Sequence, residues 1–465
     1  MDNIEEDILI TKKHIAEYSR RFGLRKILSG IHLWGIGVGT VIAGTFFGWN
    51  YGLEQSGSLG FFITTLIVTS FYLVLTFLFS ELSILFPYAG GPYAYVRKGL
   101  GTFGGYLTGI FTISEFLCAS SAVTISIASY ISYCYPSIPK MYVAMGVYLI
   151  FLAIDILGIK QSAIFQLTVT SIAISTLVIF FISTLPSVDL STTFAKEPFI
   201  NGYKGIIQAI PFALWFYVCI EGISLAAEET KNPKIDMLFG FKSSIWTVVI
   251  FNLGVLIFCL SSVDWKVLLS NDYPLSSVLK IVQPGSKISL MVFTTLALSS
   301  LLASLHGMMN GFSRQTFALS RAGYLPKFLS RIHPITKTPY LAIILPGMIG
   351  MTLAYHATAR TLVFTAGLSA LLMYVLVISS YLKFKMHSEQ QGKTKFRVKW
   401  FILLCFIALI LFVLVFLYIK NSDNTLKIAI FFLIIVLYYI FIGRKFIVND
   451  APEEREAQDK KIIIR

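Results

Sequence analysis

Twelve apolar runs along the chain are each long enough to cross a lipid bilayer as a helix, which needs about 20 residues. Only 13% of the residues are charged and 56% are hydrophobic, whereas about a quarter of the residues in soluble domains are charged. We therefore predict an all-α integral membrane protein with twelve transmembrane helices. The runs fall at residues 30–52, 58–80, 103–131, 141–158, 163–185, 206–227, 239–262, 288–319, 340–357, 361–382, 399–419 and 425–442.

Basic residues are distributed unevenly among the loops between these runs. With the amino terminus in the cytoplasm, 29 of the 38 Lys and Arg residues fall on the cytoplasmic side, in agreement with the positive-inside rule. An even number of spans then predicts two cytoplasmic termini and a location in the cytoplasmic (plasma) membrane. The net charge of +14 thus indicates orientation and contact with anionic membrane lipid, and we expect no nucleic acid partner.

The first run, HLWGIGVGTVIAGTFFGWNYG at residues 32–52, contains six glycines. Each glycine destabilises a helix interior by roughly 1 kcal/mol relative to alanine. Non-helical backbone is tolerated at membrane depth only where it lines a cavity in the protein. We therefore predict a broken helix with its break near residues 40–44. Close packing of a second helix on the glycines is the alternative explanation.

The sixth run, AIPFALWFYVCIEGISLAAEETKNPK, begins at Ala209 and predicts a second break at Glu221 and Gly222. Five spans separate the starts of the two broken helices, and an odd number of spans reverses orientation in the membrane. The chain is therefore predicted to contain two five-helix repeats of inverted topology. In transporters of this kind, the interrupted helices form a substrate site near the membrane midplane.

Four stretches carry a resemblance to a known family. FPYAGGPYAYVRK, which follows Glu81 and Leu82, resembles the P-x-x-G-G-x-Y-x-Y end of the second helix in the amino acid, polyamine and organocation (APC) transporter superfamily. The first and sixth runs are similar to those of its ethanolamine permeases, and residues 305–339 are similar to the end of their eighth helix and the loop after it. Thr45 departs from that branch, where the position is often acidic.

The resemblance implies a 5+5 inverted-repeat core plus two C-terminal helices. We expect a cytoplasmic arm at residues 1–29, a first five-helix repeat at 30–185 and a second at 206–382. Two additional transmembrane helices at 399–442 and a cytoplasmic tail at 443–465 complete the expected organisation. The first 29 residues lack the apolar core of a signal peptide.

The two breaks predict the substrate site. Backbone N–H groups at a helix amino end bind a carboxylate, whereas an ammonium group prefers exposed carbonyls, a carboxylate or an aromatic face. Both groups together specify an amino acid, and an ammonium with a hydroxyl specifies an ethanolamine-like amine; the sequence has partners for either. The predicted substrate-binding residues are Gly39, Thr40, Ile42, Ala43, Gly44, Thr45, Phe212, Trp215, Glu221 and Gly222.

The coupling ion, H⁺ or Na⁺, is left open, and no cofactor is expected. Sodium would need carbonyls at the first break with hydroxyls on the eighth helix, whereas protons would use an intramembrane acid or histidine. Asp155, at the end of the fourth run, is interpreted as a capping residue. Glu228 and Glu229 are expected to pair with Arg97, Arg314 or Arg321 as a cytoplasmic latch. The predicted coupling and gating residues are Glu115, Glu228, Glu229, Ser300, Ser304 and His306.

These features predict a secondary active transporter, a permease that moves a small amino acid or amine by alternating access. No P-loop of the form G-x-x-x-x-G-K-[S/T] and no nucleophile, metal or cofactor motif is present in the sequence, so we do not expect an enzyme. The alternatives are an ethanolamine-specific permease, an amino acid or amine exchanger and, more distantly, a channel. Oligomeric state and the direction of transport are not predicted.

Overall fold

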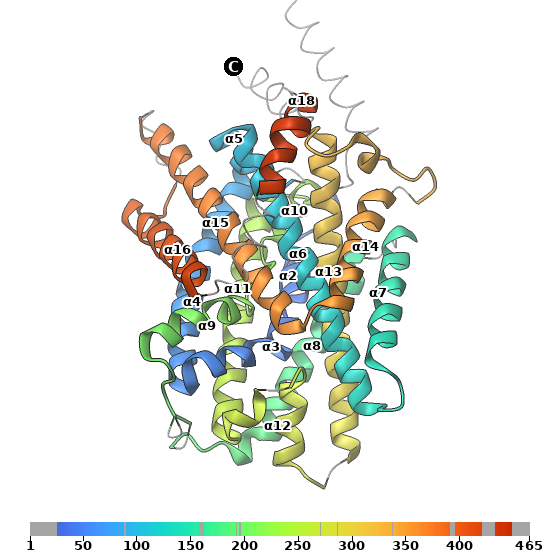
Figure 1. Cartoon of the computed structure of the whole chain (residues 1–465), viewed down its shortest axis with the longest axis vertical. Coiled ribbons are helices and arrows are strands. Elements are labelled where there is room, and N and C mark those ends of the chain that lie inside the picture. The colour runs from blue at the N-terminus through green and yellow to red at the C-terminus, as the bar shows by residue number, and fades with distance from the viewer. Residues whose placement is uncertain are drawn as a thin grey trace, which may run out of the picture.

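The computed structural model describes residues 26–448 except 88–89, 158–161, 192, 195–196, 270, 286, 337, 391–395 and 421–432. Within these residues the regular elements are helices, most of which run along the long axis of the molecule (Figure 1). The α-helices are α2 Gly30–Val41, α3 Ala43–Phe46, α4 Leu53–Leu85, α5 Pro92–Leu100, α6 Thr102–Cys134, α7 Lys140–Leu157, α8 Ser162–Thr184, α9 Gly202–Leu214, α10 Gly222–Leu225, α11 Pro233–Ser262, α12 Pro274–Val282, α13 Lys287–Arg321, α14 Tyr340–His356, α15 Ala359–Gln390, α16 Trp400–Lys420 and α18 Arg444–Phe446.

Seven of the described helices, α4, α6, α7, α8, α11, α13 and α15, are long and apolar enough to cross a membrane. Shorter apolar helices lie at Gly30–Phe46, Tyr340–His356 and Trp400–Val415. The sixth predicted run is divided by a break, and residues 425–432 of the twelfth lie outside the described residues, as do residues 1–25 of the arm and 449–465 of the tail. The protein is a multi-pass membrane protein, and twelve spans stay a prediction.

Helix α6 lies at the centre of the bundle, where it packs along α13 and α15. Its most apolar 18-residue window is 83% buried inside the protein. Several hydroxyl-bearing residues on α6 donate to carbonyls one turn earlier, as Thr108 does to Gly104 and Thr112 does to Thr108. Because these hydroxyls are satisfied within their own helix, they permit close packing without buried unpaired donors.

The glycines of α2 serve close packing, as the alternative interpretation of the first run expected. Helix α2 packs against α8, α11 and α13. A methyl group added at Gly39 would lie 2.3 Å from both Gln166 Nε2 and Thr170 Oγ1. Helix α8 therefore approaches the backbone of α2 more closely than any larger residue would allow.

The Gly-Gly-Pro stretch that ends the second run turns the chain into a helix that the sequence did not predict. Gly91 has φ +46°, and α5 begins at the following Pro92. A methyl group at Gly91 would lie 2.5 Å from Ser224 Oγ on α10. Glycine is required here both for the left-handed backbone and for the close approach to α10.

Candidate functional site

The first predicted break is present, and a side chain from another helix produces it. Ile42 separates α2 from α3. Ser304 Oγ on α13 accepts a hydrogen bond from the Ala43 N–H at 3.0 Å and donates to the Gly39 carbonyl at 2.7 Å. The hydroxyl thus stands in the place of the direct Ala43-to-Gly39 bond of a regular helix. Insertion of a side chain into this ladder is an established cause of helix kinks.

The second break is longer than predicted, since it occupies residues 215–221 between α9 and α10 rather than only Glu221 and Gly222. Cys219 has φ +72°, a left-handed conformation that is rare for a residue with a side chain. Its N–H donates to Glu115 Oε1 at 3.0 Å, and the Phe216 carbonyl accepts from Asn252 Nδ2 at 2.9 Å. Side chains from other helices therefore satisfy this irregular backbone, as burial in a membrane protein requires.

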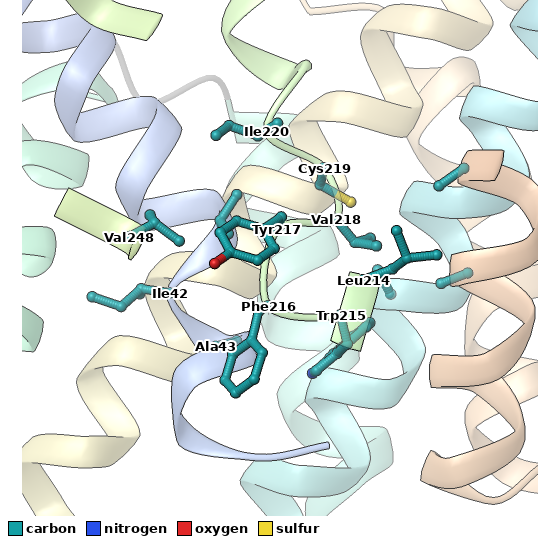
Figure 2. Close-up of a cluster of buried hydrophobic side chains, with 14 of the residues drawn as sticks. Ile42, Ala43, Leu214, Trp215, Phe216, Tyr217, Val218, Cys219, Ile220 and Val248 are labelled. Atoms are coloured by element: carbon teal, nitrogen blue, oxygen red, sulfur yellow. The ribbon is translucent and has the colours of Figure 1, made fainter. Parts of the chain in front are cut away.

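The two breaks lie against each other in the middle of the bundle. Figure 2 shows Ile42 and Ala43 beside the irregular segment that carries Phe216 and Tyr217. A methyl group at Gly44 would lie 2.4 Å from the Trp215 carbonyl oxygen. Glycine at this position is therefore what permits the contact between the two backbones.

Asn252 on α11 joins the two breaks through hydrogen bonds. Its Oδ1 accepts from Thr45 Oγ1 at 2.5 Å, and its Nδ2 donates to the Phe216 carbonyl. A second connection runs from Trp215 Nε1 to the Phe47 carbonyl at 2.8 Å. Sequence reasoning missed Asn252, although a carboxamide in the apolar run 239–262 is a signal for such a role, because polar groups inside a membrane need partners.

The predicted substrate-binding residues are brought together to different degrees. Those at residues 42–45 and Trp215 line the contact between the breaks and are buried. Phe212 is also buried, but its ring lies against Tyr51 and beneath the Arg360 guanidinium, 5.8 Å from the ring centre. An aromatic face for an ammonium was one predicted use of Phe212, and the described structure places a protein cation there.

Thr40 and Gly222, one from each broken helix, line a cavity of about 40 Å³. The cavity extends along α13, which contributes His306, Asn310 and Arg314. Arg314 Nη2 also lies 2.9 Å from Glu229 Oε1, an ion pair with partly exposed side chains. The cavity thus runs from the second break toward this ion pair.

Glu115, a predicted coupling residue, and Glu221, a predicted substrate-binding residue, meet beside the second break. Oxygen atoms of the two carboxyls and Cys219 Sγ all lie within 4.8 Å of one another, and both glutamates are fully buried. Tyr374 donates to Glu221 Oε2 at 3.1 Å and also hydrogen bonds with Tyr72. Two negative charges at this separation repel by at least about 3 kcal/mol at an effective dielectric constant of about 20.

His306 forms a buried pair with Asp155, whose interpretation as a capping residue is wrong. The Asp155 carboxylate lies in the last turn of α7, with Oδ1 2.9 Å from His306 Nδ1. Asn310 Nδ2 lies 3.1 Å from His306 Nε2. The sequence did not predict this pair, because only the fold brings α7 and α13 side by side.

The two predicted sodium hydroxyls have different surroundings. The Ser304 hydroxyl is hydrogen bonded to the backbone of the first break on both sides, to the Ala43 N–H and the Gly39 carbonyl. Ser300, one turn earlier on α13, is fully buried, and its hydroxyl has no hydrogen-bond partner among the described residues. Glu228 lies next to Glu229 and is partly exposed.

At the end of the molecule that carries α12 (Figure 1), Asp272 ties the loop before that helix to three other segments. Its carboxylate accepts hydrogen bonds from Tyr51 at 2.5 Å and from Ser129 at 2.7 Å, and it lies 2.6 Å from Lys140 Nζ. Burial acts to raise the pKa of Asp272, but Lys140 and these hydrogen bonds together hold that pKa below its ordinary value. The loop is thereby anchored over the broken helices on this side.

Comparison with known proteins gives one family match that spans most of the chain. The family model described as amino acid permease matches residues 32–461. An uncharacterized transporter of Rhizobium meliloti is 27% identical over 78% of this chain and 80% of its own length. The methylthioribose transporter of Bacillus subtilis is 25% identical over 83% and 86%, and a branched-chain amino acid permease of the same species is 24% identical over 70% and 74%.

Proposed function

This chain belongs to the amino acid permease family, and on that premise we propose that it is a secondary active transporter that binds a small amino acid or amine at its two helix breaks. The family and its relatives support a transporter of amino acids or related compounds. The observation that carries the proposal is the direct contact between the breaks at Gly44 and the Trp215 carbonyl. Interrupted helices that meet inside a membrane protein supply backbone dipoles for a charged solute.

In this proposal the substrate ammonium binds at Glu221. One oxygen of that carboxyl accepts from Tyr374, and the other, Oε1, is buried and has no hydrogen-bond partner among the described residues. A substrate carboxylate, where there is one, binds the backbone N–H groups near Thr40 and Gly44 at the first break. Ile42, Ala43, Thr45 and Trp215, which are buried at the contact between the breaks, form the walls of this site.

An ethanolamine-like amine is the second candidate substrate. The two acids next to the second break, with no cationic partner among the described residues, favour a substrate with an ammonium group and no carboxylate. At position 45, where ethanolamine permeases often have an acid, this chain has Thr45, whose hydroxyl donates a hydrogen bond to Asn252. Ethanolamine itself is therefore a candidate to be tested beside amino acids.

The proposed mechanism is alternating access within two inverted five-helix repeats at residues 30–185 and 206–382. The broken helices α2/α3 and α9/α10, together with α4 and α11, rock against a scaffold of α6, α7, α13 and α14. The ion pair between Glu229 and Arg314 latches the cytoplasmic side. Partly exposed pairs of this kind contribute at most about 1 kcal/mol, which suits a latch that must open in every cycle.

Counterflow in proteoliposomes tests the function. Liposomes loaded with one unlabelled solute from a panel of alanine, leucine, lysine, ethanolamine, putrescine and methylthioribose should take up the same labelled solute in a saturable manner. A carrier shows counterflow with at least one of these solutes. Large electrical currents without counterflow would identify a channel instead and overturn the proposal.

Glu221→Gln tests the ammonium site. Loss of a charge-assisted hydrogen bond costs about 1.5–3 kcal/mol, so the apparent affinity for the winning solute should fall roughly 10- to 150-fold. Glu197→Gln is the matched control, because Glu197 is an exposed acid paired with exposed Lys266. Unchanged affinity in Glu221→Gln would remove this residue from the site.

A further inference from the structure

Glu115, Cys219 and Glu221 place three metal-binding groups around one point beside the second break. One carboxylate oxygen of each glutamate and the Cys219 Sγ all lie within 4.8 Å of one another, and the three side chains are fully buried. Glu115 lies on α6, whereas Cys219 and Glu221 belong to the break between α9 and α10. The fold thus assembles a set of ligands whose members lie about a hundred residues apart, since Glu115 and Cys219 are separated by 104 positions.

Two oxygen atoms of these glutamates have no partner. The Cys219 N–H donates to Glu115 Oε1, and Tyr374 donates to Glu221 Oε2. The other two oxygens, Glu115 Oε2 and Glu221 Oε1, are buried and have no hydrogen-bond partner among the described residues. No lysine, arginine or histidine in the described part of the chain forms an ion pair with either acid. Buried carboxylates without partners take up a proton or a cation.

The three ligands select a particular class of cation. Thiolate sulfur is a soft ligand that favours Zn²⁺ and similar ions, whereas Ca²⁺ and Mg²⁺ prefer oxygen ligands. Ligand atoms lie about 2.0–2.3 Å from Zn²⁺, which places them about 3.5 Å apart in a tetrahedral site. The atoms of this triad, which lie within 4.8 Å of one another, therefore need to close by at most about 1.3 Å. Three protein ligands leave the fourth position of the ion to water.

We propose that Glu115, Cys219 and Glu221 bind one thiophilic divalent cation of the Zn²⁺ class, which inhibits transport by competing with the substrate ammonium group. The competition rests on the proposed function, in which Glu221 binds that ammonium, whereas the metal site itself does not. On binding, the Cys219 thiol releases its proton to water, and its sulfur forms the bond to the metal. The ion offsets two of the three negative ligand charges. The donors on the outer oxygens, the Cys219 N–H and Tyr374, orient the two carboxylates.

Direct binding is measured with Cd²⁺, which binds thiolates as Zn²⁺ does and whose bond to sulfur absorbs ultraviolet light. Titration of the full-length protein in detergent with CdCl₂ should produce this absorption and saturate at one ion per chain. Cys219→Ser should abolish the absorption. Cys405→Ser is the matched control and should retain it, because Cys405 is an exposed thiol on α16. Equal absorption in Cys219→Ser and the wild type would overturn the site.

Inhibition is measured by counterflow in proteoliposomes with the solute that the protein transports. Zn²⁺ and Cd²⁺ should inhibit, whereas the same concentrations of Mg²⁺ and Ca²⁺ should not. Because the three ligands are fully buried, the ion enters by the opening that admits the substrate, and more solute should raise the half-inhibitory metal concentration in proportion. Inhibition that excess solute does not relieve would overturn the competition.

Variants of the triad test its ligands in the same assay, each compared with its own metal-free rate. Cys219→Ser and Glu115→Gln should each raise the half-inhibitory Cd²⁺ concentration at least about tenfold, because the loss of an outer hydrogen-bond partner alone weakens metal binding about 10- to 100-fold. Glu197→Gln, which changes an acid in an exposed ion pair, should leave that concentration unchanged. An unchanged value in both triad variants would overturn the site.

The outcomes distinguish this inference from the function on which its competition rests. Counterflow without inhibition or Cd²⁺ absorption would overturn the metal site and leave the transporter intact. Absence of counterflow for every solute would overturn the proposed function, and the absorption would still test the metal site. Should Cys219→Ser fail to fold, X-ray absorption spectroscopy of the wild-type protein with one Zn²⁺ decides. The expected shell has one sulfur at about 2.3 Å and oxygens at about 2.0–2.2 Å, and a shell without sulfur would contradict the proposal.

Discussion

Asn252→Leu tests whether one carboxamide holds the two helix breaks together. The substitution leaves the Thr45 hydroxyl and the Phe216 carbonyl without the partners that Asn252 provides. Because Asn252 is fully buried, water cannot replace them, and each orphaned group costs about 1–3 kcal/mol. The free energy of unfolding should therefore fall by about 2–6 kcal/mol. Transport should slow, because the two helix breaks are no longer held in position relative to each other.

A double-mutant cycle with Thr45→Val isolates the contact between the two side chains. Unfolding is followed by circular dichroism in mixed micelles of increasing denaturing detergent. Since both substitutions remove the same hydrogen bond, the double variant should be more stable than the sum of the single effects predicts, by about 0.6–1.7 kcal/mol. Strictly additive effects, or an Asn252→Leu protein as stable as the wild type, would refute the bridge.

Three further changes test separate parts of the structure. Gly44→Ala should abolish counterflow, because its methyl group would collide with a backbone carbonyl of the second break. Gly146→Ala is the control and should transport normally, because its methyl group would meet open space. Equal transport activity of the two variants would contradict the close contact at Gly44. Asp272→Asn should lower thermal stability at neutral pH. Because the pKa of Asp272 in the folded protein lies below its ordinary value of about 3.9, the difference in stability from the wild type should persist above about pH 4 and vanish as the pH falls through the lowered pKa. A difference in stability that does not depend on pH would refute the ion pair. Glu228→Gln combined with Glu229→Gln should change transport rates by several-fold if the ion pair of Glu229 with Arg314, worth up to about 1 kcal/mol, acts as the proposed latch. Unchanged rates would contradict the latch.

Local sequence features predicted the class of protein and the position of both breaks. The length of the apolar runs, the glycines of the first run and the acid beside Gly222 can each be read from a single segment. Inside a bilayer, few backbone structures are compatible with such segments. The first break falls at Ile42, within the predicted interval, and the second ends at Glu221. Among the local elements, the full length of the second break and the helix α5 that follows Gly91 were not foreseen.

Only the tertiary structure decided how the site is assembled, because its contacts join residues far apart in the chain. The Glu115 carboxylate meets the Cys219 N–H across 104 residues, Asn252 meets Thr45 across 207, and Ser304 meets Ala43 across 261. No periodicity or local motif encodes such pairings. The sequence by itself determined that this chain enters a membrane and interrupts two helices there. Packing of the bundle determined which side chains satisfy the interrupted backbone, and it brought two acids together with no ion-pair partner among the described residues.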